Sequence, residues 1–399
     1  MGLHRYRLAV AAAFATQGFV FISLTTRLPD IKDRWSFSAL EVSLSLLAVV
    51  LLAGLGSVLA ERYAARADSA AILRIGLVGI GIGMPLMVAA PAVVVYAGGV
   101  AVYGVALGAV DAATNMQAVA LEHRYGRPIL PSFHGAWTLG GVLGTVLTLS
   151  TSSLPLPAAA VVGALPLVVA ALRYLPRDHG TPSATPSATA VDIAIPWRPI
   201  LLVGLGMVVF YMVDTASQTW GAVYLDEVFS APSRWLALAT LPYLVASLLI
   251  RFAGDGLVAR FGAVPVLRVG AVVACAGLAL VVTAPTWPLA VVGFTVVGTG
   301  ISVVAPLSFS AAAKIAGASG DAGRDRIDAV IARFNQFNYV GGLLGAVLTG
   351  VIGKDQLRFG FVIPMILVLT LLPLARHFAA VTPAPAPGTV RPLETSEEA

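Results

Sequence analysis

Long apolar stretches follow one another along almost the whole chain, and short polar segments separate them. Each stretch is between 16 and 30 residues long, and a helix needs about 20 apolar residues to cross the hydrocarbon layer of a bilayer. Only Pro91 separates the third stretch from the fourth, but one helix over both would be far longer than a bilayer is thick. The pattern predicts twelve spans, at Tyr6–Thr26, Ala39–Ala60, Ser69–Ala90, Ala92–Leu121, Pro131–Thr151, Pro157–Leu172, Ile200–Leu225, Trp235–Ala253, Val264–Thr283, Trp287–Ala313, Ile327–Ile352 and Phe359–Ala375.

The chain carries few charges for its length. Hydrophobic residues make up 58% of it and charged residues 11%, with a mean hydropathy of +0.88, whereas a soluble domain averages about 25% charged residues. In a bilayer only helices and closed barrels satisfy the backbone, and these stretches are too long for barrel strands. We therefore predict an all-α membrane protein. The net charge of +5 comes from basic residues that stand singly, so we expect anionic lipid rather than nucleic acid as their partner.

The basic residues are unevenly divided between the two sides of the predicted membrane. With a cytoplasmic N-terminus, the inside segments hold 17 Lys and Arg residues and the outside segments hold 6. Cytoplasmic loops of membrane proteins are enriched in Lys and Arg, and an even number of spans puts both termini on one side. We therefore expect a multi-pass protein of the inner (plasma) membrane with both termini in the cytoplasm.

A polar segment divides the twelve stretches into two sets of six. It contains the low-complexity run Thr181–Thr189, which has no means of burying a core. The residues after Val381 are rich in proline and then acidic, which predicts disorder. The expected organisation is an N-terminal six-helix bundle at residues 1–175, a cytoplasmic linker at 176–197, a C-terminal six-helix bundle at 198–378 and a disordered cytoplasmic tail at 379–399.

The two halves contain related sequences. Leu139–Thr148 reads LGGVLGTVLT and Val340–Thr349 reads VGGLLGAVLT, with seven of ten positions identical at an offset of 201 residues. A second match, in the same order along the chain, pairs Ile72–Gly76 with Val266–Gly270 at an offset of 194. The repeat predicts two pseudo-symmetric bundles. Such halves can rock against each other around a site near the middle of the membrane.

Two six-span halves, a polar linker and basic loops after spans two and eight resemble the major facilitator superfamily. That family carries a Gly-x-x-x-Asp-Arg-x-Gly-Arg-like motif after span two. The matching stretch is Ser57–Arg66, in which Glu61 stands at the acid and Ala64 replaces a glycine. The stretches Thr25–Trp35 and Asp111–Gly141 are similar to the bacterial branch of fucose-permease-like carriers. The resemblance implies a secondary transporter that works by alternating access and uses no cofactor.

Two departures from the family leave the direction of transport open. Fucose symporters carry an acid in span one, where this chain offers only Gln17. The Gly-Pro pair of drug antiporters is missing from Leu139–Thr148. Neither import nor export is therefore fixed by a motif.

Three titratable groups lie inside predicted spans and are candidates for proton coupling. Asp111 lies near the middle of the fourth span and Asp214 lies in the seventh, and His134 is the histidine inside the fifth. A carboxylate in the membrane is costly unless it is protonated or paired, and such groups often carry protons. Histidine titrates near neutral pH and can relay them. The structural alternatives are acids hydrogen-bonded to a neighbouring helix and a histidine that serves packing.

Polar and aromatic side chains share helical faces with these groups, which predicts a central cavity. We expect the substrate to contact Gln17, Asn115, Gln117, Trp137, Tyr211, Gln218, Trp220, Asn335, Gln336, Asn338 and Tyr339. No Lys or Arg lies near the middle of a predicted span, so a strongly anionic substrate would find no counter-charge. The expected substrate is neutral or cationic.

Charged residues at the predicted cytoplasmic ends of spans two and eight suit a conformational latch. Arg251 and Asp255 are four residues apart, which allows an ion pair on one helix face. The expected latch residues are Glu61, Arg62, Arg66, Arg251, Asp255 and Arg260.

The candidate residues favour a proton-coupled transporter but leave its cargo open. The aromatic side chains, with Tyr224, Phe334 and Phe337 added, favour efflux of a small amphiphilic compound. The polar side chains favour the alternative, import of a sugar or another small metabolite. A non-transporting sensor or scaffold is a third interpretation. The sequence contains no phosphate-binding loop and its five histidines are scattered, so we expect no ATP-driven pump, metal site or enzyme. We expect a monomer.

Overall fold

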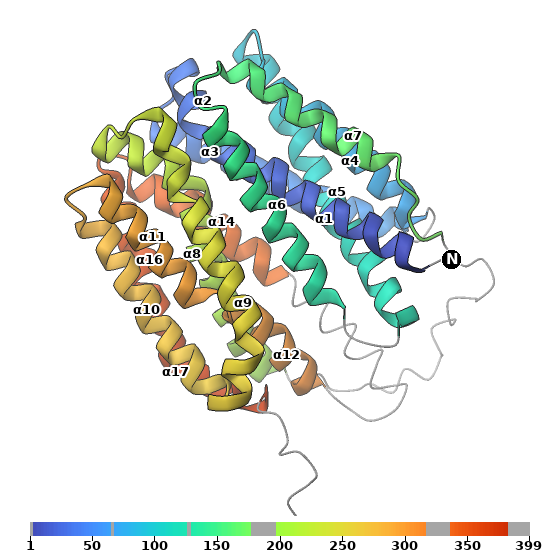
Figure 1. Ribbon diagram of the computed structural model, residues 1–399, viewed down its shortest axis with the longest axis vertical. Helices are drawn as coiled ribbons and strands as arrows, with labels where there is room; N and C mark the ends of the chain where they lie inside the picture. The colour runs from blue at the N-terminus through green and yellow to red at the C-terminus, as the bar shows by residue number, and fades with distance from the viewer. Residues whose placement is uncertain (1–2, 65–67, 126–128, 177–196, 317–335, 382–399) are drawn as a thin grey trace, which may run out of the picture.

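The computed structural model describes residues 3–64, 68–125, 129–176, 197–316 and 336–381. Within these ranges every regular element is a helix, as predicted (Figure 1). The first half of the chain forms α1 (Leu3–Thr25), α2 (Leu28–Trp35), α3 (Ala39–Ala64), α4 (Ser69–Val88), α5 (Val93–Tyr125), α6 (Leu130–Ser150), η1 (Leu156–Gly163) and α7 (Ala164–Ala170). The second half forms α8 (Trp197–Phe229), η2 (Ser233–Ala239), α9 (Leu241–Phe261), α10 (Ala263–Thr283), α11 (Trp287–Ile301), α12 (Val304–Ala316), α14 (Gln336–Ile352), α15 (Leu357–Gly360), α16 (Val362–Leu367), η3 (Val368–Thr370), α17 (Leu371–Leu374) and η4 (Ala375–Val381).

Nine helical segments among the described residues are long and apolar enough to cross a membrane. Three further predicted spans correspond to α6 and to the shorter apolar segments Leu156–Ala170 and Gln336–Ile352. The predicted start of the eleventh span, Ile327, lies outside the described residues. The total of twelve crossings therefore stays a prediction.

Local sequence explains where several helices begin and end. The break at Pro91 is confirmed, because α4 ends at Val88 and α5 begins at Val93. Ser38 and Glu41 hydrogen-bond reciprocally before α3, with the Ser38 backbone N–H 2.7 Å from Glu41 Oε2, which is the arrangement of a capping box. The last apolar segment is divided into α15, α16, η3, α17 and η4. The last of these continues to Val381, so helix extends into the segment predicted to be disordered.

Helix ends gather on two sides of the protein. The side that holds the beginnings of α1, α4, α6 and α8 is called the terminus side, and the side that holds their ends, together with α2, is called the far side (Figure 1). On the far side, Arg34 of α2 donates to the Ala90 carbonyl at 2.6 Å, and Arg358 donates to the Ala284 carbonyl at 2.8 Å. These bonds satisfy carbonyl groups at the ends of apolar helices.

The second repeated sequence makes the same contact in both halves. Arg74 of α4 donates to the carbonyl of Leu172 at 3.3 Å, and Arg268 of α10 donates to that of Leu372, also at 3.3 Å. Each arginine thus ties the third long helix of its half to the last apolar segment of that half, just after α7 in the first half and in α17 in the second.

The first repeated sequence supplies glycines for close helix packing in both halves. A Cβ atom at Gly140 would overlap the carbonyl of Ala15 in α1. At the matching position of α14, a Cβ at Gly341 would lie 2.7 Å from the Tyr211 Cβ of α8. Small residues allow such close approach, which is how helices associate in lipid. The repeated sequence therefore forms the same kind of helix contact in both halves, between α1 and α6 and between α8 and α14.

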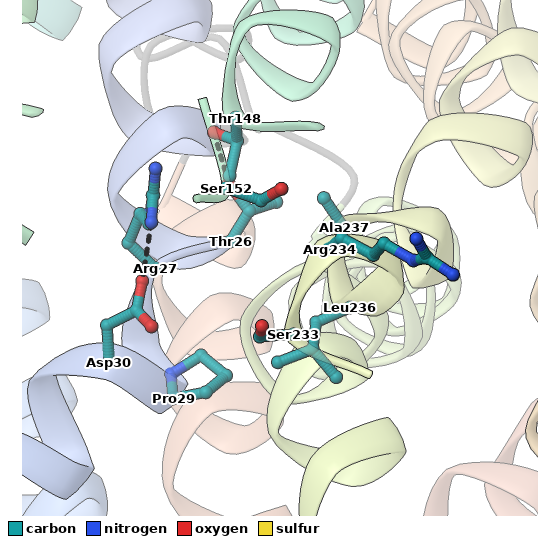
Figure 2. Close-up of a pocket in the computed structure, with 10 residues that line it drawn as sticks. All are labelled: Thr26, Arg27, Pro29, Asp30, Thr148, Ser152, Ser233, Arg234, Leu236 and Ala237. Atoms are coloured by element: carbon teal, nitrogen blue, oxygen red, sulfur yellow. Dashed lines mark hydrogen bonds and ion pairs between the residues drawn. The ribbon is translucent and has the colours of Figure 1, made fainter. Parts of the chain in front are cut away.

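The far ends of the two halves pack against each other. Ile22, Val42 and Leu46 of the first half are buried in the same apolar cluster as most of the second half. A Cβ at Gly350 of α14 would meet both Ser43 of α3 and Trp220 of α8. Between the halves lies a cavity of about 10 Å³, enough for about one water molecule. It is lined by Thr26, Arg27, Pro29, Asp30, Thr148, Ser152, Ser233, Arg234, Leu236 and Ala237 (Figure 2).

One ion pair joins the halves on the far side, and it gives a testable prediction. Lys32 Nζ lies 3.1 Å from Glu227 Oε1, with about a quarter of each side chain exposed. We expect Lys32→Glu and Glu227→Lys each to lower the free energy of unfolding by about 0.2–1 kcal/mol, which thermal melting detects as a slightly lower melting temperature. The double exchange should restore the wild-type melting temperature. Lys354→Glu, at an exposed lysine on the far side, is the control. A double exchange that is no more stable than either single variant would contradict the pairing.

Candidate functional site

Asp111 joins the two halves of the protein. It lies on α5, and its side chain is partly exposed. Tyr339 of α14 donates its hydroxyl to Asp111 Oδ2 at 2.8 Å, and Gln17 of α1 donates to Oδ1 at 3.5 Å. Asn115, one turn along α5, donates to the backbone carbonyl of Asp111 at 2.9 Å. Three predicted site residues on three helices therefore surround this aspartate.

Asp214 is the centre of a second group within the second half. The hydroxyl of Tyr243 on α9 donates to Asp214 Oδ1. Gln218 lies one turn along α8 and is also in hydrogen-bonding range of the Asp214 carboxylate. Asp214 is partly exposed, as Asp111 is. Each of the two acids thus lies beside a tyrosine and a glutamine, although the tyrosine that bonds to Asp111 comes from the other half.

Tyr211 connects the two groups. It lies on α8, one turn before Asp214, and it is within electrostatic range of Asp111, Asp214 and Arg251. The side chains form one polar cluster between the halves, in which α1, α5, α8, α9 and α14 each contribute at least one residue. We call this set the central cluster: Gln17, Asp111, Asn115, Tyr211, Asp214, Gln218, Tyr243, Arg251 and Tyr339.

Arg251 lies in the central cluster and brings a positive charge to it. Its Nη1 donates to Thr138 Oγ1 of α6 at 2.8 Å, across the two halves. It is also within electrostatic range of Asp214 and Tyr243. Although no Lys or Arg lies near the middle of a predicted span, the long side chain of Arg251 brings a cation to this site. The predicted pair with Asp255 lies outside the described side chains.

His134 lies beside this group on the α6 side. It is exposed, its ring lies 5.5 Å from that of Phe14, and its backbone carbonyl accepts from Thr138 at 3.1 Å. Arg251 is within electrostatic range of it. Trp137, on the same helix, is partly buried with its ring 6.2 Å from that of Phe21.

Two predicted cavity residues serve helix packing elsewhere. Gln117 is buried and bonds to Ser69 Oγ at 2.8 Å and to the backbone of Leu175. Trp220 is fully buried and donates to the Ala346 carbonyl at 2.7 Å. Neither therefore belongs to the central cluster, because their polar atoms are satisfied by neighbouring helices.

Other predicted residues are only partly described. Gln336 is exposed at the start of α14, Asn338 is partly exposed, and Asn335 lies outside the described residues. Of the latch residues, Arg62 and Arg260 are exposed, and Arg260 lies 5.2 Å from the Phe261 ring. Arg66 and the side chain of Glu61 lie outside the described part, so the latch stays a prediction.

Sequence reasoning missed Tyr243, whose signal is a tyrosine directly after Pro242 inside an otherwise apolar span. It also missed Thr138, which accepts from Arg251. Within the described part of the chain, no three His, Cys, Asp or Glu side chains gather in a way that could hold a metal ion.

The chain is similar in sequence to two bacterial proteins. An uncharacterised transporter of Sinorhizobium fredii is 29% identical over 313 residues, covering 76% of this chain and 81% of that protein. An uncharacterised MFS-type transporter of Yersinia pestis is 27% identical over 374 residues, covering 91% of this chain and 93% of that protein. Both relatives are named as transporters.

Solved structures share the fold. A mutant form of the nucleoside transporter NupG has a TM-score of 0.70 at 14% identity, covering 94% of this chain and 99% of that one. A bacterial homologue of the lysosomal transporter Spinster, inward-facing and unoccupied, has a TM-score of 0.69 at 15% identity, covering 95% of this chain and 98% of that one. FucP in its outward conformation has a TM-score of 0.62 at 16% identity, covering 93% of this chain and 98% of that one.

The family follows from the sequence itself. At these identities the solved structures show the fold alone. The family model described as Major Facilitator Superfamily matches residues 8–323, which is well over half of the 399 residues. The chain therefore belongs to the Major Facilitator Superfamily.

Proposed function

We propose that this transporter exports a small amphiphilic compound in exchange for protons, with Asp111 and Asp214 as the proton-binding groups. The observation that carries the proposal is the hydrogen bond between Asp111 and Tyr339, because it links a titratable group of one half to the other half. A change of charge at Asp111 acts directly on a contact between the parts that move in alternating access.

Proton binding weakens this contact. An ionised carboxylate accepts hydrogen bonds with both oxygens, whereas a protonated one keeps less acceptor capacity and gains a donor. Tyr339 donates to Asp111, so protonation of Asp111 lowers the strength of that bond. The equilibrium between conformations then depends on whether the proton is bound, which is the thermodynamic meaning of coupling.

Exchange requires that substrate and protons exclude each other. Asp111 and Asp214 lie among the polar and aromatic side chains that would contact the substrate. A substrate that bonds to these carboxylates competes with protons for the same oxygen atoms, which favours export against an inward proton gradient. In this proposal the terminus side is cytoplasmic, as the distribution of Lys and Arg predicts.

The second candidate, proton-coupled import, is favoured by the polar character of the central cluster. Two aromatic residues that suggested an amphiphilic cargo, Trp220 and Tyr224, bond to backbone carbonyls inside the second half. The side chains that remain, such as Gln17 and Gln218, are polar and suit a hydrophilic metabolite. Both candidates use the same cluster and differ in the direction of flow.

Metabolite profiling of a deletion strain tests the proposed function. We compare cells and medium of the deletion strain with those of the same strain carrying the wild-type gene. Accumulation of one compound inside the deletion cells supports export, and purified protein in liposomes should then move that compound when a pH gradient is imposed. Depletion inside the cells with loss of uptake would instead support import, and no flux under any gradient would support a sensor or scaffold.

A further inference from the structure

Arg251 is the residue of the central cluster whose chemistry the proposed function leaves unused. It lies on α9, three residues before the end of the apolar span Ser233–Gly254, and it bonds to the other half of the protein. A guanidinium group stays charged in proteins. Placing it inside the membrane is unfavourable unless an anion or several acceptors surround it.

The partners of Arg251 satisfy only part of this requirement. Its Nη1 donates to a neutral oxygen, Thr138 Oγ1, at 2.8 Å. Its Nε is buried and has no hydrogen-bond partner among the described residues. The ion pairs between described side chains are Arg27–Asp30 and Lys32–Glu227, and neither includes Arg251.

The nearest acid of the cluster is already engaged. Asp214 accepts from Tyr243 and is in hydrogen-bonding range of Gln218, so it interacts with Arg251 through space rather than through a direct bond. Among described residues, the fork of donors that Arg251 carries therefore faces no carboxylate in bonding contact. Arginine binds carboxylates with two parallel hydrogen bonds, which is a geometry that lysine cannot reproduce.

Two other atoms of the cluster are buried without partners in the described part of the chain, and both are acceptors. They are Oε1 of Gln17, on α1, and Oε1 of Gln218, on α8. The two glutamines are 6% and 3% exposed, and Gln17 directs its Nε2 towards Asp111. An unpartnered acceptor at such a depth requires a donor, supplied by a bound water or by a ligand.

We propose that Arg251 binds a carboxylate of the transported compound, and that Gln17 and Gln218 accept hydrogen bonds from hydroxyl or amino groups elsewhere on it. The substrate is then an organic acid that also carries hydroxyl or amino groups. This inference rests on the proposed function only in using the same cluster as the transport site. It replaces the neutral or cationic substrate that the sequence alone predicts.

Binding to purified protein tests the inference without transport. The full chain in detergent is melted in the presence of hydroxy- and amino-carboxylates of three to six carbons, each paired with its analogue in which a primary amide replaces the carboxylate. A ligand that binds the folded protein raises its melting temperature. We expect at least one acid to do so and its amide analogue to have no effect.

Variants of Arg251 separate binding from folding. Arg251→Gln should weaken binding of that acid about 10- to 100-fold, as expected for hydrogen bonds to a charged group. Arg251→Lys keeps the charge but not the fork, and should bind with intermediate affinity. Arg260→Gln, at an exposed arginine of the same helix, should bind like the wild type. Gln17→Leu and Gln218→Leu should each weaken binding of the acid but not of its analogue lacking the hydroxyl or amino group.

Several outcomes would overturn the inference. One is a panel in which no acid stabilises the protein, and another is an Arg251→Lys variant that binds the acid as tightly as the wild type. Unchanged binding by the glutamine variants would mean that water fills those positions. If the acid binds through Arg251 and yet no pH gradient drives its flux, the inference stands and the proposed function fails. If protons drive the flux of an uncharged compound and the Arg251 variants transport it normally, the proposed function stands and the inference about Arg251 fails.

Discussion

Asp111→Asn is expected to abolish proton-driven transport while leaving the protein folded and able to bind its cargo. Asparagine has the shape of aspartate and keeps one oxygen that can accept from Tyr339, so the bond between the halves survives. It cannot bind or release a proton. The contact that responds to protonation in the wild type is then fixed in one state, and an imposed pH gradient has no group at this position on which to act.

The measurement uses liposomes that contain the purified protein and the compound found by metabolite profiling. The variant should show no accumulation driven by a pH gradient, but it should still exchange labelled for unlabelled compound at equal concentrations. Asp33→Asn, at an exposed acid of α2, is the matched control and should behave like the wild type. Gradient-driven accumulation by Asp111→Asn at the wild-type rate would remove Asp111 from the coupling mechanism.

Gly140→Val is expected to prevent correct assembly of the first half. Any side chain at Gly140 would overlap the carbonyl of Ala15, and the backbone of α1 cannot move aside as a flexible side chain can. Overpacking in a well-packed core costs about 1–3 kcal/mol and more where backbone must shift. Because α1 also carries Gln17, displacement of this helix should disturb the central cluster as well.

The control for this prediction lies on the same helix. A Cβ at Gly135 of α6 meets no atom within 4 Å, so Gly135→Val introduces the same side chain without the overlap. Gel filtration and thermal melting of both variants in detergent measure the difference. We expect Gly135→Val to give a single sharp peak near the wild-type melting temperature and Gly140→Val to aggregate or to melt at a much lower temperature. Equal behaviour of the two would show that α1 and α6 pack less closely than the structure indicates.

The helices could be predicted from sequence because their signal is local. Apolar length alone identifies most spans, and Pro91 marks the boundary between α4 and α5 since proline ends a helix. The division of the last segment into α15, α16 and α17 could not be foreseen with equal precision. Pro364 and Pro373 mark it as irregular, but packing against neighbouring helices decides where each turn closes.

The site could be predicted only in part, because the faces of these helices are hard to distinguish. Asp111 and Asp214 stand out as acids in apolar sequence, and the structure brings both into the central cluster. The sequence does not distinguish Trp220, which serves packing, from a tryptophan that lines a cavity. A membrane helix is apolar all round and shows little amphipathic pattern. The length of the Arg251 side chain explains another difference, because an arginine whose Cα lies near the end of a membrane span can reach several ångströms towards its middle.

The packed far side of the protein has an electrical consequence. Among the described residues, Ser43 against Gly350, the apolar cluster around Ile22 and the ion pair of Lys32 with Glu227 leave no wide aqueous path between the halves there. In a transporter that works by alternating access, a side closed in this way would act as an electrical insulator. Ions would then not run through it as through a channel, and charge would cross the membrane only with a change of conformation.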